Sequence, residues 1–571
     1  MGETDQDLDT TKDLDTSYVA DFETTTDELD CRVWLWGFCN VRDIDDWCHG
    51  NDIDSFMLYM RTYNRCHIYF HNLAFDGAFI LDWLLNNGFT HEQSRNKKSP
   101  LTFSTLISKM AQFYSIKVVF ENGSRVEFRD SLKKLPMSVA NIAKAFKLDE
   151  GKGQLDYHLI RPVGYVPTSV ELDYLRRDVQ IVARALNVQL VSGMKRLTVG
   201  ADSLQEYKTL IGGTKAFERS FPILCTTMDD DIRRAYRGGF TYADPRHQGT
   251  RTRAGRVYDV NSLYPSVMYD RPMPYGEPRW FTGAPTVSED YPLFVVALTL
   301  TAKLKPDHIP CIQIKGSPHF AATLYQTDIT DPVTLTCTSV DLALWNDHYD
   351  LNILSWEGGW KFHAITGFFT KYIDKWMKVK ESTTGGLRFI AKLHLNSLYG
   401  KFATNPDVTP KIPILDDDNI VRLVTGDEET RNPVYTPVGV FITSYARDVT
   451  IRAAQQHYDV FAYADTDSLH LLVDSDPIGL DVHPTRLGAW KSEGMFSEAI
   501  FVRAKCYSER MIDGTHQTHI AGLPESIAKQ VTLDDIVDGA VWSGKLSPHR
   551  VKGGIVLRSV DFTLNMHTNQ P

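Results

Sequence analysis

Carboxylates interrupt apolar segments at two places that lie more than 200 residues apart in the chain. Asp259 stands inside an apolar strand predicted over 256–260, and Asp465 and Asp467 stand at the turn of an apolar hairpin over 460–473. A lone D-x-D at a turn is usually explained by turn chemistry. Burying these acids without a cation would be costly, however. A pair of divalent cations held by Asp259 and Asp467 could activate a hydroxyl and neutralise a triphosphate in line with it.

A basic helical hairpin lies between these two places. Helical spacing over 370–380 and 387–399, with a turn at 382–386, predicts two helices. Residues 371–401 carry a net charge of +5, which a solvated basic face could also explain. Four side chains nevertheless share one helical stripe, which suits a triphosphate and its base: Arg388, Lys392, Asn396 and Tyr399.

A second set of acids falls in the first 200 residues: Asp21, Glu23, Asp76 and Asp178. Asp21 and Glu23 are two residues apart on a predicted strand, so both side chains leave the same face. The third follows a strand predicted over 67–70, and the fourth lies four residues after Tyr174 on a predicted helix. An isolated D-x-E is usually solvated, but acids from a strand, a loop and a helix could together hold two divalent cations for phosphodiester hydrolysis. Tyr174 could then orient the attacking water.

Strand and helix patterns alternate across 17–200 and predict an α/β N-terminal domain. A strand at 33–38 is the expected hairpin partner of the first strand, and helical spacing covers 170–197. Residues 271–367, rich in Pro and Thr, favour β structure and loops, and a further helix is expected to begin near Thr443.

The net charge of −11 does not argue against a nucleic-acid partner, because −10 of it falls in residues 1–30. Residues 1–16 are acidic with almost nothing to bury, which predicts a disordered tail. No window reaches the roughly 18 apolar residues that a membrane span needs, and no targeting signal is visible. The eight cysteines form no C-x-x-C pair, which favours a reducing cytosol over a disulfide framework or zinc site. Membrane, secreted-scaffold and fibrous classes are excluded.

Residues 539–545 nearly match a phosphate-binding P-loop, but Leu546 replaces the Ser or Thr that would bind Mg²⁺. We therefore do not predict an NTPase site there.

The motifs, in their order along the chain, resemble those of the protein-primed family B DNA polymerases of small tailed Bacillus phages, the phi twenty-nine type. Three segments resemble the family's exonuclease motifs: 21–26, 72–76 and 174–178. Three more resemble its polymerase motifs A, B and C: 259–265, 392–400 and 463–468. Residues 236–239 look like the linker between the two domains, and 505–507 like the K-x-Y motif.

This resemblance implies a multidomain α/β and α+β fold, with an RNase H-like 3′-5′ exonuclease domain followed by a right-hand palm, fingers and thumb polymerase with two insertions. The implied boundaries are a tail over 1–16, the exonuclease domain over 17–199, the palm over 200–270 and 436–522, the first insertion over 271–367, the fingers over 368–403, the second insertion over 404–435 and the thumb over 523–571. The first insertion would contact a terminal protein that primes synthesis. The second would close a ring around DNA, for processivity and strand displacement.

The resemblance also implies residue roles. Metal ligands at the polymerase site would be Asp259, Asp467 and the carbonyl of Val260, with Asp465 as a third carboxylate. Metal ligands at the exonuclease site would be Asp21, Glu23, Asp76 and Asp178, assisted by Tyr174 and Lys152. The nucleotide would be bound by Tyr264, Lys380, Lys392, Asn396 and Tyr399, with the Tyr264 ring excluding a 2′-hydroxyl. DNA would be bound by His71, Asn72, Phe75, Ser131, Leu132, Tyr236, Arg237, Gly238, Gly239, Ser262, Thr443, Arg447, Lys505 and Tyr507.

The implied function is DNA-dependent DNA polymerisation, protein-primed, processive and strand-displacing, with 3′-5′ proofreading, in replication of a linear viral genome. The implied cofactor is Mg²⁺, replaceable by Mn²⁺, at two ions per site. The implied partners are primer–template DNA, dNTPs and a terminal protein, with the enzyme a monomer in the cytoplasm of an infected bacterium. Three departures are Gln154, where the family commonly has an acid, a short stretch between Tyr507 and Gly522, and the extra acidic tail before Ser17.

Two other hypotheses remain open: a nuclease whose polymerase half is vestigial, and a replication scaffold that binds DNA and a priming protein. Neither needs the nucleotide-binding residues that stand intact here, among them Tyr264 and Lys392.

Overall fold

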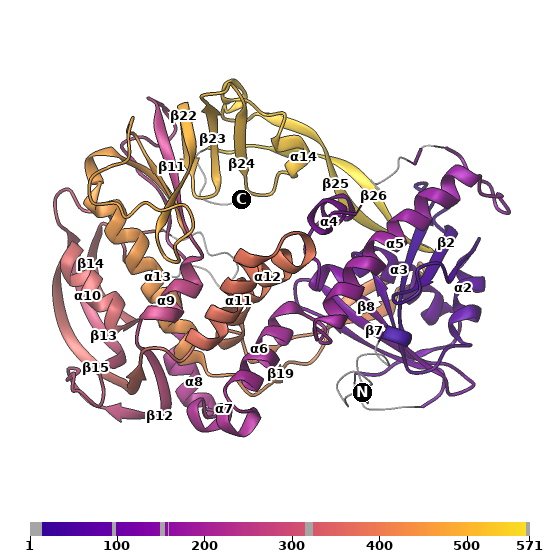
Figure 1. Cartoon of the computed structure of the whole chain (residues 1–571), viewed down its shortest axis with the longest axis horizontal. Coiled ribbons are helices and arrows are strands. Elements are labelled where there is room, and N and C mark those ends of the chain that lie inside the picture. Colours follow the sequence, from indigo (N-terminus) through magenta and orange to yellow (C-terminus); the bar gives the residue numbers. More distant parts are fainter. Residues whose placement is uncertain (1–13, 94–98, 149–154, 158, 315–323, 567–571) are drawn as a thin grey trace.

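The computed structural model describes residues 14–93, 99–148, 155–157, 159–314 and 324–566 (Figure 1). Most of the expected tail, residues 1–13, lies outside this range. Its last residues were wrongly assigned to the tail, because Leu14 is buried and the carbonyl of Thr16 accepts a hydrogen bond from the His67 N–H at 2.8 Å.

The N-terminal unit is built on an eight-stranded mixed sheet in the order β3-β2-β1-β4-β8-β7-β6-β5. The expected hairpin of the first two strands is confirmed, and β1 also pairs in parallel with β4. The strands are β1 (Ser17–Thr24), β2 (Val33–Asn40), β3 (Trp47–Gly50), β4 (Cys66–Phe70), β5 (Thr90–His91), β6 (Thr102–Ile107), β7 (Phe113–Val119) and β8 (Arg125–Asp130).

Helices pack on this sheet and are joined to it by two apolar cores. They are α2 (Ile53–Met60), α3 (Leu73–Asn86), α4 (Val139–Phe146) and α5 (Ser169–Val191), with the short η1 (Ser131–Lys133) after β8. The expected long helix begins at a capping box made by Thr168 and Glu171. It ends at Val191 rather than 197, because Gly193 takes the left-handed conformation at φ 85°.

A second sheet forms the centre of the remaining chain, in the order β24-β23-β22-β11-β21-β20-β9, with β10 beside β22. Its central strand carries Asp259, and the hairpin beside it carries Asp465 and Asp467. The strands are β9 (Thr241–Ala243), β10 (Arg251–Thr252), β11 (Gly255–Val260), β20 (Phe461–Asp465), β21 (Ser468–Leu471), β22 (Trp490–Arg503), β23 (Cys506–Met511) and β24 (His516–Ile520).

The expectation of β structure over 271–367 is confirmed for the described residues, which form a four-stranded antiparallel sheet in the order β12-β15-β13-β14. These strands are β12 (Met273–Phe281), β13 (Leu293–Leu304), β14 (Asp328–Thr338) and β15 (Tyr349–Ile365). The helix α10 (Ser339–His348), which was not expected, connects β14 to β15.

Helices join the N-terminal unit to these two sheets. They are α6 (Val199–Leu210), α7 (Thr214–Ser220), α8 (Thr226–Arg233), α9 (Leu263–Asp270), α11 (Thr370–Ser382), α12 (Gly385–Phe402) and α13 (Thr436–Gln456), with η2 (Tyr458–Val460) leading into the hairpin. The helical hairpin α11–α12 is confirmed. The helix expected near Thr443 begins seven residues earlier, where Pro437 occupies its first turn.

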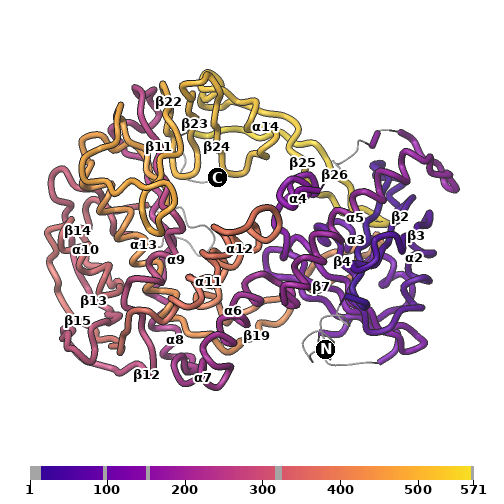
Figure 2. The backbone as a smooth tube through the Cα atoms, in the orientation of Figure 1, coloured from indigo at the N-terminus to yellow at the C-terminus, as the bar shows by residue number. Residues whose placement is uncertain are grey.

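The chain ends in a hairpin that returns to the N-terminal unit (Figures 1 and 2). Valines and isoleucines of this hairpin share an apolar core with α3 and with Val421 of a second small hairpin. The elements are β16 (Asp407–Val408), β17 (Lys411–Leu415), β18 (Val421–Thr425), β19 (Glu429–Thr430), α14 (Glu525–Ala528), η3 (Leu533–Asp535), β25 (Val541–Val551) and β26 (Gly554–Thr563). The residues that nearly match a P-loop run into β25, so they do not join a strand to a helix.

Candidate active sites

The second sheet brings Asp259 and Asp467 together. Asp259 lies opposite Ser468 in the antiparallel pairing of β11 and β21, and the N–H of Val260 donates to the Asp467 carbonyl at 2.8 Å. The pKa of Asp259 is raised to about 7 by burial first and by the charge of Asp467 second. Burial also raises the pKa of Asp467. Both carboxyls therefore lie where a cation would stabilise their ionised forms.

Asp465 is held differently from its neighbour. Its carboxylate accepts hydrogen bonds from Lys505 Nζ at 2.8 and 3.1 Å and from Thr241 Oγ1 at 3.0 Å. The Lys505 N–H also donates to the hydroxyl of Tyr463 at 2.8 Å. The K-x-Y segment is thus fastened to the D-T-D turn, and Asp465 already has a cationic partner within the chain.

Thr466, between the two acids, takes the left-handed conformation at φ 61°, which is unusual for a β-branched residue. Its N–H donates to the Phe240 carbonyl at 2.6 Å, and its carbonyl accepts from Thr450 Oγ1 at 2.8 Å. The segment around Gly239 therefore forms one wall of the turn.

Side chains from α9, α11 and α12 lie next to the Asp259–Asp467 pair. Tyr264 and Tyr399 stack with ring centroids 4.0 Å apart. Lys380 Nζ donates to Ser262 Oγ at 3.1 Å, and Ser262 caps α9 in the left-handed conformation. Burial lowers the pKa of Lys380, and Lys392 and Arg388 lower it further. These bases form a concentrated positive field next to the paired acids.

The predicted stripe on α12 is exposed at Arg388, Lys392 and Asn396 and half-buried at Tyr399. The opposite face packs into the core, as an amphipathic helix requires.

Lys491 and Glu493 also belong to this environment, although the sequence did not indicate them. Lys491 lies opposite Asp259 across β11 and β22, and its amine pairs with Glu493 at 2.6 Å. Both residues act on the pKa of Asp259, Glu493 raising it and Lys491 lowering it. Only the strand register reveals this placement.

The acids of the N-terminal unit also converge. Glu23, Asp76 and Asp178 are buried. The pKa of Asp76 is raised well above its usual value by burial first, then by the charge of Asp21. Among the described residues, Asp76 Oδ1 has no hydrogen-bond partner.

Tyr174 lies beside these acids on α5. Its hydroxyl is 3.0 Å from that of Tyr157, and burial together with Tyr157, Asp178 and Glu23 raises its pKa. Lys152, also predicted for this site, lies outside the described residues, as does Gln154.

The predicted primer-end residues lie at the start of α3 and in η1. Ser131 Oγ donates to the Phe70 carbonyl at 3.0 Å and lies 2.9 Å from His71 Nδ1. Asp130, which the sequence did not indicate, binds both segments, because its carboxylate accepts from the N–H groups of Asn72 and Leu132 at 3.2 and 3.0 Å. Phe75 and Leu132 are half-buried, and Asn72 is exposed.

Three of the residues predicted to bind DNA are buried: Arg237, Thr443 and Arg447. Arg447 pairs with the buried Asp341 at 2.8 Å and donates to the carbonyls of Arg237 and Gly238 at 2.8 and 2.9 Å. This placement argues against direct phosphate contact, because the guanidinium is already bonded inside the protein. It favours a structural role, in which Arg447 holds the 236–239 linker through the hydrogen bonds to its carbonyls. Gly238, by contrast, is exposed.

The described residues contain no group of three or more His, Cys, Asp or Glu side chains placed to hold a metal ion by themselves. Mg²⁺ usually binds one or two carboxylates together with substrate phosphates and waters. The Asp259–Asp467 pair and the partnerless oxygen of Asp76 fit such partial coordination.

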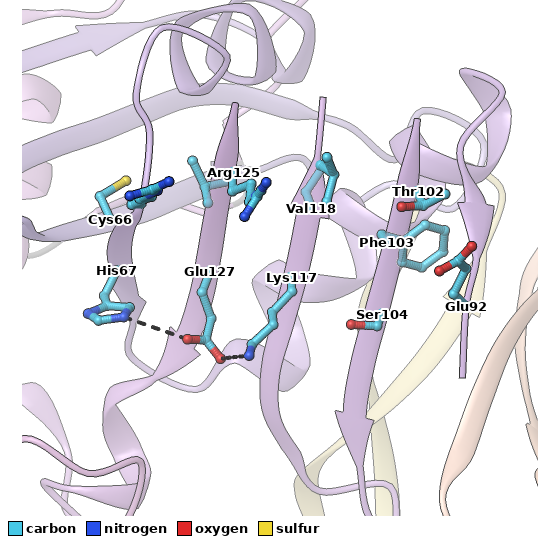
Figure 3. Close-up of a pocket in the computed structure, with 13 residues that line it drawn as sticks. Cys66, His67, Glu92, Thr102, Phe103, Ser104, Lys117, Val118, Arg125 and Glu127 are labelled. Carbon is cyan, nitrogen blue, oxygen red and sulfur yellow. Dashed lines mark ion pairs between the residues drawn. The ribbon is translucent and has the colours of Figure 1, made fainter. Parts of the chain in front are cut away.

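The described residues that line a hollow on the N-terminal sheet include none of the predicted site residues (Figure 3). In it, Glu127 pairs with His67 at 3.7 Å and with Lys117 at 3.8 Å.

Of the helices that the structure describes, none has the length and apolarity to cross a bilayer.

Comparison with known proteins gives concordant matches. The family described as "DNA polymerase type B, organellar and viral" matches residues 58–171 and 161–476. The DNA polymerase of Bacillus phage Nf is 43% identical over 96% of this chain and 99% of its own, and that of Streptococcus phage Cp-1 is 33% identical over 96% and 98%. Phi29 DNA polymerase complexed with primer–template DNA and incoming nucleotide substrates is 42% identical, with a TM-score of 0.91 over 96% of this chain and 99% of that one.

Proposed function

Because this chain belongs to the type B, organellar and viral DNA polymerases, and among them to the phi29 type of Bacillus phages, we propose that it is a processive, strand-displacing DNA polymerase with a separate 3′-5′ proofreading site. The observation that carries this proposal is the presence of two separate groups of acids, one on β1, α3 and α5 and the other on β11 and the β20–β21 turn, the second of which lies beside the stacked Tyr264 and Tyr399 and the bases of α11 and α12.

Polymerisation would take place at Asp259 and Asp467, which would hold two divalent cations with the carbonyl of Val260. When bound, these cations supply activation of the primer hydroxyl and neutralisation of the triphosphate. Lys380 and Lys392 would bind the triphosphate. The stacked pair of Tyr264 and Tyr399 would form the floor under the sugar and the new base pair.

Asp465 would act by positioning, since it accepts from Lys505 and Thr241. Lys505 and Tyr507 would lie along the primer strand, and Lys505 would couple that strand to the turn that carries Asp467. Tyr236, Gly238 and Gly239 would line the same path.

Proofreading would take place at the buried acids of the N-terminal unit. Asp21, Glu23, Asp76 and Asp178 would hold two divalent cations, and Tyr174 would orient the attacking water. His71, Asn72, Phe75, Ser131 and Leu132 would bind the unpaired primer end. The Asp130 contacts to both segments support this assignment, because they fix the segments relative to one another.

Processivity and strand displacement would come from a closed ring. Three contacts fasten the β25–β26 hairpin to the N-terminal unit: an Arg558–Glu28 ion pair, a hydrogen bond from the Gly553 N–H to Asp82 at 3.2 Å and a hydrogen bond from the Cys31 thiol to the Ile555 carbonyl at 3.6 Å. Val421 of the 404–435 insertion shares the same core.

Protein priming through the 271–367 insertion, a monomeric state, and action in the cytoplasm of an infected bacterium on a linear viral genome complete the proposal. They rest on the similarity to the phage polymerases.

The test is primer extension with Mg²⁺ and dNTPs on a template that carries a downstream blocking strand, beside incubation of single-stranded DNA without dNTPs. We expect extension through the blocking strand and, separately, shortening of the single strand. Shortening without extension would favour a nuclease, and neither activity would favour a scaffold. Extension that stops at the blocking strand would contradict the ring.

A further inference from the structure

Lys134 is a fully buried lysine that binds three groups at the junction between the N-terminal unit and the rest of the chain. Its amine donates to the carbonyls of Met194 and Arg196 at 2.8 and 2.9 Å and to Asp202 Oδ2 at 2.8 Å. The side chains of Lys134 and Asp202 are 0% and 3% exposed. Burying two charges is costly, and the three hydrogen bonds that the Lys134 amine donates offset part of that cost.

On one side, Lys134 belongs to the turn that carries Ser131 and Leu132. Its N–H donates to the Ser131 carbonyl at 2.9 Å, and its own carbonyl accepts from Gln189 Nε2 of α5 at 2.8 Å. A displacement of Lys134 would therefore move the segment that we assign to the primer end.

On the other side, Asp202 lies on α6, which packs along α12 (Figure 2). The next residue, Ser203, has its Oγ 3.3 Å from Nδ1 of His394 on α12. His394 is also bonded by the hydroxyl of Tyr372 and stacks on Trp376 of α11 at 3.9 Å. Asp202 and Ser203, adjacent on α6, thus contact the turn that carries Ser131 and Leu132 and the helix α12, which we assign to nucleotide binding.

We propose that Lys134 is a positioning residue shared by both active sites: through Asp202 it holds the Ser131–Leu132 turn and the nucleotide helix α12 in one arrangement. The inference rests on the proposed function and adds to it a residue that touches neither substrate. Its loss raises the KM for single-stranded DNA and the KM for dNTP together, while the acids that carry out the chemistry keep their places.

The test uses the double variant Lys134→Met/Asp202→Leu in the full-length enzyme. The double variant removes both charged groups and so leaves no unpaired buried charge. Replacing a buried ion pair by apolar side chains of similar size is often neutral for stability. Each KM is expected to rise several-fold, with each kcat within about twofold of wild type. The dNTP concentration at which a primer changes from shortening to extension should shift as well.

Two matched variants sharpen the result. Ser203→Ala removes the Ser203–His394 hydrogen bond between α6 and α12 and should raise the dNTP KM while leaving the DNA KM unchanged. Lys117→Met removes a lysine of the same unit that pairs with Glu127 on the open sheet face, and should change neither (Figure 3).

A double variant with unchanged KM values would overturn the inference, and so would a fall in both kcat values without a change in KM, because that pattern means loss of folded enzyme. If the double variant does not fold, Asp202→Asn takes its place with the same expected KM changes. A wild-type enzyme lacking one of the two activities would instead contradict the proposed function, so the two failures are distinguishable.

Discussion

Gly239 lies directly against Thr466, so that a methyl group on Gly239 would come within 2.7 Å of Thr466 Cγ2 and 2.8 Å of its Oγ1. This contact joins the 236–239 linker to the turn that carries Asp465 and Asp467. Thr466 has little room to move, because its backbone is bonded to Phe240 and Thr450 on either side.

Gly239→Ala should therefore displace the D-T-D turn. A misplacement of about 1 Å can reduce catalysis by around 10²-fold, and we expect a loss of 10- to 100-fold in dNTP incorporation with single-strand shortening retained. Gly238→Ala is the matched comparison, since a methyl there meets nothing within 4 Å. Steady-state incorporation assays measure both, and equal losses in the two variants would contradict the steric account.

Lys505→Met should weaken polymerisation by about tenfold, because Asp465 loses its cationic partner and the turn loses a fastening. The free energy of unfolding should change by less than about 1 kcal/mol, since the Lys505 side chain is 60% exposed. A double-mutant cycle with Asp465→Asn, read in kcat for incorporation, should show strong non-additivity. Additive losses would mean that the two side chains act independently.

Tyr264→Val should relax selection against ribonucleotides, because the ring stacked on Tyr399 would form a wall at the 2′ position of the sugar. The discrimination between dNTP and rNTP should fall by about 10- to 200-fold, the range expected for one steric contact. Tyr264→Phe keeps the ring and should keep the discrimination. The ratio of kcat/KM for dGTP and rGTP measures the effect, and a large loss in the Phe variant would shift the role to the hydroxyl.

His394 should make the protein less stable as the pH falls. Burial, followed by the charges of Lys375 and Lys134, lowers its pKa to about 3. Between that value and about 6.5 the unfolded state binds the extra proton, so stability decreases by about 1.4 kcal/mol per pH unit well below pH 6.5. His394→Met should remove this contribution. Urea unfolding at pH 6.5 and 5.0 measures it, and an equal pH dependence in both proteins would contradict the lowered pKa.

Much of this arrangement could be predicted because the pattern was local. Asp21 and Glu23 alternate on one strand, and Asp465 and Asp467 stand at the turn of an apolar hairpin, as expected. Arg388, Lys392 and Asn396 of the α12 stripe are exposed because the opposite face of the helix carries its buried side chains.

Contacts between distant strands could not be predicted in the same way. The pairing of Lys491 with Asp259 depends on the register of β22, and the contact of Lys505 with Asp465 depends on a turn 40 residues away. The family resemblance implied a DNA-binding role for Arg447, but the residue is buried and pairs with Asp341, which comes from another part of the chain.

Two separate groups of acids are proposed to catalyse the two reactions, and variants that abolish one activity and keep the other test this most directly. Primer extension and single-strand shortening would be measured for Asp467→Asn, for Asp21→Ala/Asp76→Ala and for the exposed control Asp474→Asn, each checked for folding by thermal unfolding. We predict that Asp467→Asn loses extension by at least about 10³-fold and keeps shortening, that the double variant shows the reverse, and that the control keeps both. Loss of both activities in either folded variant would contradict the account.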